Sequence, residues 1–164
     1  MEYVNADSIA AGISGFQPQT VAFDAGRTML KRLHALAEQR LSFAFETTLA
    51  SRTWAPWILS LREKGYAFNL VFVWLVTAEI AGQRVQERAR TGGHDIPEEA
   101  IRRRYQRGIR NFHELYRPMA SSWVVYNNSM SGVPEIIAEG RENRRDIIHQ
   151  PALWSMFSRE CPWK

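Results

Sequence analysis

The chain has 164 residues, of which 45% are hydrophobic and 12% aromatic, so it can build the packed core of one domain and is not a disordered chain. Its one cysteine, Cys161, excludes an internal disulfide and fits a reducing compartment. No apolar run approaches the roughly 20 residues of a membrane span, and residues 1–20 lack a secretory pattern, so we expect a soluble, cytoplasmic protein without a membrane partner. The net charge is +4, and its positive part is concentrated in 84–110, where eight arginines accompany four acids.

Short apolar runs along the chain predict strands. They occupy 3–7, 41–48, 68–75 and 122–128, and 134–140 is a candidate for a last strand. The third run, "FNLVFVWL", is continuously apolar, which is typical of a strand covered on both faces.

Helical patterns lie between these runs. One helical face is formed by Val21, Ala25, Met29, Leu33 and Leu36. Further helices are predicted from Ser51 or Thr53 to Lys64, where Gly65 stops the helix, over 77–90, from Pro97 onward, and over 141–157. The alternation predicts an α/β fold with a mostly parallel sheet flanked by helices, in a single domain over 1–164.

The helix that starts at Pro97 is rich in arginine. Its apolar stripe consists of Ile101, Tyr105, Ile109, Phe112 and Tyr116, and the side chains opposite it, Arg103, Arg107 and Arg110, are predicted to face solvent. Arg102 and Arg104 flank the stripe, where they can reach a neighbouring cleft. The cluster is either a solvated face or a basic lid over about 84–110, and the pair Gly92-Gly93, a natural hinge, favours the lid.

Two acids follow predicted strands. Asp7 comes after "YVNA", and Glu46 lies in "FAFETT". Ligands of parallel sheets bind beyond the carboxyl ends of the strands, where a carboxylate can accept a proton or hold a magnesium ion. Asp7 can equally be a helix cap before "SIAAG". Together with an arginine-rich lid, the two acids are typical of phosphoryl transfer, in which positioning and charge stabilisation dominate.

The segments "VNAD", "FAFETTLASRT", "GYAFNLVFVWL", "RVQERARTGGHDIPEEAIRRRY", "NFHELYRPMASSWVVYNNS" and "IAEG" occur in this order over about residues 3–140. This ordered set resembles the zeta-toxin family of P-loop kinases, in its chromosomal bacterial branch. "GGHDIPEEAIRRRY" is its most specific member.

The resemblance implies an ATP-dependent kinase fold that uses ATP and Mg²⁺. It also implies UDP-N-acetylglucosamine as the acceptor of the phosphoryl group and an antitoxin as a protein partner. By motif, Asp7 matches the catalytic base, and Thr48 and Arg52 fall in the segment that contacts the sugar nucleotide, with Glu46 beside them.

The lid residues carry over less completely. Arg84 and Arg88 lie where the family has an arginine that touches the ATP phosphates. His94 replaces a second lid arginine of the plasmid-borne toxins, which leaves Arg102 or Arg104 as substitutes. A glutamate that those toxins use before the third strand has no match here, since the register falls near Leu30.

The family begins with a strand and the loop G-x-x-x-x-G-K-[ST], which cradles phosphates, and this sequence contains no such motif. It opens on what resembles the second strand of the family. We therefore expect an N-terminally truncated chain without the first, central strand. Such a chain should be inactive or impaired as a kinase and should self-associate through an incomplete sheet.

Two other functions stay open. The chain can be a catalytically inactive relative that binds a nucleotide sugar or an antitoxin-like protein, or a basic nucleic-acid-binding module built on 84–110. The second lacks a groove-reading motif and ranks last. Trp54 and Trp57 can stack on a uracil ring or simply pack in the core. No His or Cys spacing predicts a metal site, and no G-x-S-x-G elbow indicates a hydrolase.

Overall fold

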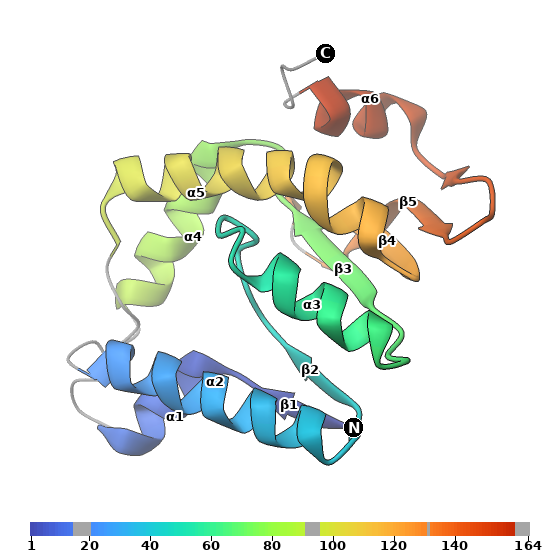
Figure 1. The fold of residues 1–164 in the computed structure, drawn as a ribbon. Coiled ribbons are helices and arrows are strands. Elements are labelled where there is room, and N and C mark those ends of the chain that lie inside the picture. Colours follow the sequence, from blue (N-terminus) through green and yellow to red (C-terminus); the bar gives the residue numbers. More distant parts are fainter. Residues whose placement is uncertain (15–20, 91–95, 131, 160–164) are drawn as a thin grey trace. The chain divides into compact units, whose positions relative to one another are not determined.

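A computed structural model describes residues 1–14, 21–90, 96–130 and 132–159 (Figure 1). It contains two compact units, Met1–Thr47 and Thr48–Lys164, and each is described by itself. The expectation of a single domain stays a prediction. None of the helices in the described ranges is long and apolar enough to cross a membrane.

The first unit is a two-stranded parallel sheet with two helices. Its elements are β1 (Glu2–Val4), α1 (Ala6–Ile13), α2 (Ala22–Glu38) and β2 (Phe43–Phe45), and Glu2 to Val4 pair with Phe43 to Phe45. The predicted face of α2 is confirmed from its second member onward, because Ala25, Met29, Leu33 and Leu36 are all buried.

The second unit contains a four-stranded sheet in the order β3-β4-β5-β6. Its elements are α3 (Trp54–Glu63), β3 (Asn69–Trp74), α4 (Ala78–Arg90), α5 (Glu98–Asn111), η2 (Phe112–Tyr116), η3 (Arg117–Met119), β4 (Ser122–Asn127), β5 (Glu135–Arg141), β6 (Ile147–Ile148) and α6 (Pro151–Arg159). Strands β3 and β4 are parallel, as predicted, and β5 and β6 extend the sheet with antiparallel pairings. The α/β class is confirmed.

Glycine ends α3 at the predicted place. Gly65 has a φ of +91°, its N–H donates to Arg62 O, and the next N–H, of Tyr66, donates to Leu61 O. This left-handed cap satisfies carbonyl groups that the end of a helix otherwise leaves unpaired.

The core of the second unit is aromatic. The face of β3 that carries Phe72 meets Phe112 and Phe157, with ring centroids 5.1 and 5.3 Å apart, and Phe157 contacts Trp74 at 5.4 Å. Helices α3, α5 and α6 therefore share one core with the sheet. Trp54 and Trp57 pack against this core.

Three predictions about the elements were wrong in part. Val71 and Val73 are 60% and 55% exposed, so β3 is not covered on both faces; it is an edge strand, and the core lies on its other face. Strand β1 ends at Val4 because Asn5 caps α1, so Asp7 lies in the first turn of that helix. The predicted helix over 141–157 is the end of β5, then β6, and then α6, which starts at a proline.

Candidate functional site

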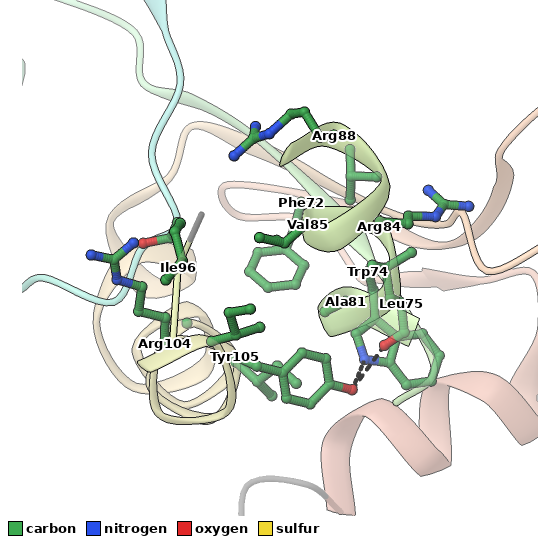
Figure 2. A pocket seen from close by; sticks show the side chains of 15 residues that line it. Phe72, Trp74, Leu75, Ala81, Arg84, Val85, Arg88, Ile96, Arg104 and Tyr105 are labelled. Carbon is green, nitrogen blue, oxygen red and sulfur yellow. Dashed lines mark hydrogen bonds between the residues drawn. The ribbon is translucent and has the colours of Figure 1, made fainter. Parts of the chain in front are cut away.

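A cavity of about 400 Å³ lies in the second unit among β3, α4 and α5 (Figure 2). Most of its wall is apolar, and it includes Phe72, Trp74 and Ile101. Three arginines also line it, Arg84, Arg88 and Arg104, and no carboxylate is present among the described lining residues. A hollow with one sign of charge and low-polarity walls attracts anions.

The three arginines do not point the same way. Arg84 donates to the backbone oxygen of Asn128 and extends to one side of the cavity, whereas Arg88 and Arg104 extend to the other side (Figure 2). Arg104 has neither an ion-pair nor a hydrogen-bond partner within the described ranges. Within those ranges, all donors of its guanidinium group are therefore available to a ligand.

Tyr105 fixes the wall of the cavity. Its hydroxyl donates to the Leu75 carbonyl at 2.8 Å and accepts from Trp74 Nε1 at 3.1 Å, which ties α5 to the end of β3 (Figure 2). Two hydrogen bonds thus hold this part of the apolar wall in place, and they leave none of the polar atoms involved without a partner.

Arg102, the fourth lid arginine, does not line this cavity. Its guanidinium group lies 3.0 Å from Glu79 on α4 and 3.3 Å from Glu98 on its own helix. The pKa of Glu79 is lowered, first by hydrogen bonds from its own backbone N–H and from Thr77, and also by Arg102. Arg102 joins α4 to α5, and its phosphate-binding role stays a prediction.

Thr48 lines the same cavity as the arginines, at the start of a loop over 48–53. The loop can approach α5 closely because residue 108 of that helix is a glycine: a Cβ atom built on Gly108 would lie 2.6 Å from the Thr48 carbonyl oxygen. Arg52, at the far end of the loop, is exposed and lies 3.8 Å from Glu114. Of the two loop residues predicted to bind substrate, only Thr48 joins the cavity.

The two candidate carboxylates lie in the first unit. Asn5 caps α1 by accepting from the Ser8 N–H, and its Nδ2 donates to Glu46 and to the Tyr3 hydroxyl, both at 3.0 Å. The pKa of Tyr3 is raised, chiefly by its hydrogen bond to Glu46, and Asp7 adds a smaller charge effect. Both acids therefore act on one hydroxyl, and their predicted approach to the arginines stays a prediction.

Sequence reasoning missed Tyr3, Asn5 and Gly108. A contact across some forty residues, such as that of Asn5 with Glu46, leaves no local pattern. Gly108 did leave a signal: a glycine inside a helix costs about 1 kcal/mol relative to alanine, so it usually has a packing reason. His94 and the pair Gly92-Gly93 lie outside the described residues.

Among the residues that the structure describes, no three His, Cys, Asp or Glu side chains gather in a way that could hold a metal ion. Magnesium that arrives with a nucleotide is commonly held by phosphate oxygens and only one or two carboxylates. The arginines that line the cavity present the kind of donors that phosphate oxygens accept.

Comparison with known proteins gives two matches. A family model described as "Zeta toxin" matches residues 17–133, a range that includes the cavity, the 48–53 loop and Glu46. An uncharacterized protein of Haemophilus influenzae is 28% identical over 102 residues, which cover 62% of this chain and 73% of that protein. No solved structure matches the chain.

Proposed function

The chain belongs to the zeta toxin family, and from this premise we propose that it is a kinase domain that transfers a phosphoryl group from ATP to a hydroxyl of a UDP-amino sugar such as UDP-N-acetylglucosamine. The observation that carries the proposal is the cavity, in which Arg84, Arg88 and Arg104 are accompanied by no described carboxylate. Arginine presents a planar fork of donors that matches phosphate oxygens.

The arginines have different parts in the proposal. Arg104, without a partner in the described structure, and Arg88, on the same side of the cavity, contact the phosphates of ATP. Arg84 is already bonded to Asn128 O and helps to hold the wall. The apolar wall keeps water away, and this strengthens the charge interactions of the transferring group.

The acceptor is bound by Thr48 and Arg52, with Glu46 near them in sequence. Its hydroxyl oxygen bonds to the terminal phosphorus, the bond from that phosphorus to the bridging oxygen of ADP breaks, and the hydroxyl proton passes to the carboxylate of Asp7. Because the printed sequence has no G-x-x-x-x-G-K-[ST] loop, we expect the 164-residue chain to turn over slowly, as an impaired kinase. Ligand binding is therefore the first property to measure.

Replacing Arg104 tests the site. An Arg104→Ala variant should raise the dissociation constant of ATP, measured by calorimetry, by at least about tenfold, because a charge-assisted hydrogen bond contributes roughly 1.5–3 kcal/mol. Arg103→Ala, one residue along α5 and exposed away from the cavity, should change it less than twofold. Equal losses in the two variants would mean that ATP responds only to net charge, and the cavity would not be its site.

Turnover separates the proposal from its alternative. A chain that binds ATP and UDP-N-acetylglucosamine and, with excess Mg²⁺, forms no phosphorylated sugar over hours is a catalytically inactive relative. Formation of the product makes it a kinase.

A further inference from the structure

The 48–53 loop has a backbone that its own sequence does not favour. Leu49 has a φ of +55°, in the left-handed region that residues with a side chain seldom adopt, and it is 5% exposed. Such a conformation persists only where the surroundings impose it. The residues that impose it therefore determine the conformation of the loop.

Three residues of one continuous helical segment touch consecutive parts of this loop. Gly108 allows the Thr48 carbonyl to lie where a Cβ would otherwise be. Asn111 Nδ2 donates to the Leu49 carbonyl at 2.7 Å, and the Tyr116 hydroxyl donates to the Ser51 carbonyl. The carbonyls of Leu49 and Ser51 thus accept hydrogen bonds from side chains on α5 and η2, and the missing side chain of Gly108 leaves room for the carbonyl of Thr48.

The π-helical turn η2 makes the last two contacts possible together. Residues five apart in an α-helix point about 140° away from each other, whereas a π-helix, with its i to i+5 bonds, brings them to one face. Asn111 and Tyr116 are five apart, and Phe112–Tyr116 is the π-helical turn. Turns of this kind are frequently found at functional sites.

Asn111 is not an ordinary core residue. It is 2% exposed, and its Oδ1 has no hydrogen-bond partner among the described residues. Burying an amide with one atom unpaired destabilises a fold, so an apolar side chain would pack there more favourably. What the amide adds is its donor to Leu49, the residue in the left-handed conformation.

We propose that Asn111 and Tyr116 are positioning residues, which hold the 48–53 loop so that Thr48 faces the cavity that Arg104 lines from the same helix. One rigid element then sets both the acceptor loop and a phosphate-binding arginine, and the acceptor and the donor meet at a fixed distance. The inference rests on the proposed function, in which Thr48 and Arg52 bind the acceptor. It assigns the two residues no contact with either substrate.

Tyr116→Phe removes one oxygen and keeps the ring that fills the core. Its matched control is Tyr126→Phe, which removes a hydroxyl from β4 in the same unit. The probes are UDP-N-acetylglucosamine and ATP, each measured by calorimetry on the full chain, and amide hydrogen exchange of the 48–53 loop. Asn111→Ala, measured at reduced temperature, serves as a second variant.

Both variants should raise the dissociation constant of UDP-N-acetylglucosamine at least fivefold and leave that of ATP within twofold. Exchange in 48–53 should rise about tenfold while β4 and β5 stay protected. Tyr126→Phe should change neither dissociation constant by more than twofold. A purely structural role predicts instead a lower melting temperature with unchanged affinity for the sugar nucleotide, or equal losses for both ligands, and either result overturns the inference.

Failure of the proposed function has a different signature. If the unmodified chain does not bind UDP-N-acetylglucosamine, the acceptor is wrong, and the exchange measurement alone decides on positioning. Exchange that rises only in 48–53 supports it, and exchange that rises throughout the second unit overturns it.

Discussion

Asn5 joins a helix cap to Glu46, a candidate substrate-binding carboxylate. Its Oδ1 accepts from Ser8 N–H at the start of α1, and its Nδ2 donates to Glu46 at the end of β2. The amide has a donor and an acceptor on one planar group, so it can do both at once. The orientation of Glu46 and the beginning of the helix that carries Asp7 therefore depend on one side chain.

Asn5→Ala should lower the free energy of unfolding of the first unit by about 1 kcal/mol, because the cap is lost. Asn5→Ser keeps a capping oxygen and should recover most of this, although it restores no amide donor to Glu46. Urea unfolding followed by circular dichroism measures the effect. Equal losses in the two variants would show that the bond to Glu46, and not the cap, carries the stability.

Residues differ in how far the sequence reveals them. The flanking position of Arg104 on its helix follows from a 3.6-residue period, and the structure confirms that this residue lines a cavity. The period gives Arg102 an equivalent place, yet Glu79 from another helix pairs with it. A helical wheel describes one helix only and cannot know which charges a neighbour brings.

Among the elements, α5 was predicted best. Its apolar stripe is confirmed, with Ile101, Ile109, Phe112 and Tyr116 all buried, and Arg103 and Arg107 are exposed as expected. The π-helical turn at its end was not predicted, since the stripe continues through it without a break in spacing. The backbone distinguishes it from an α-turn, because the Arg117 N–H donates to the carbonyl of Phe112, five residues back.

In a Gly108→Ala variant, helix propensity and core packing act on stability in opposite directions. Propensity alone would stabilise α5 by about 1 kcal/mol, but a Cβ atom would lie 2.6 Å from the Thr48 carbonyl, and overpacking of a core costs about 1–3 kcal/mol. We expect net destabilisation in urea unfolding followed by tryptophan fluorescence. Gly82→Ala on α4 is the control: its Cβ would meet no atom of the described residues within 4 Å, so it should be neutral or stabilising. A stabilised Gly108→Ala variant would show that the loop can move away.

At the scale of the molecule, the alternation of strands and helices was enough to predict the α/β class and most element positions. The coverage of the sheet was not predictable in this way. A continuous apolar run such as that of β3 is typical of a buried strand, yet Val71 and Val73 are largely exposed. Which face is covered depends on the helices that pack there and on the place of the strand in the sheet, and neither is a local property of the run.

His113 makes the stability of the second unit depend on pH. Its ring lies against Phe112, Trp154 and Phe157, with centroids 4.8–5.7 Å away, and its Nε2 has no hydrogen-bond partner among the described residues. Burial, and secondly the charge of Arg117, lower its pKa from 6.5 to about 4. The folded unit therefore keeps His113 neutral where an unfolded chain would protonate it.

The sign of the effect follows from linkage. Above pH 6.5 the ring is neutral in both states and the free energy of unfolding is unaffected; as the pH falls from 6.5 to 4, only the unfolded state takes up the proton, so stability is lost across that window. A shift of this size corresponds to at most about 3 kcal/mol, and solvent screening of a ring that is not fully enclosed reduces it to about 1–2 kcal/mol.

All six tryptophans belong to the second unit, so their fluorescence in urea at pH 7.5, 6.0 and 4.5 reports its unfolding. His113→Phe, which keeps an aromatic ring and cannot titrate, should flatten the pH dependence in that window, whereas His34→Gln on the exposed side of α2 should leave it unchanged. Parallel curves for His113→Phe and the unmodified chain would mean that another group supplies the pH dependence, and His113 would then be only a packing residue.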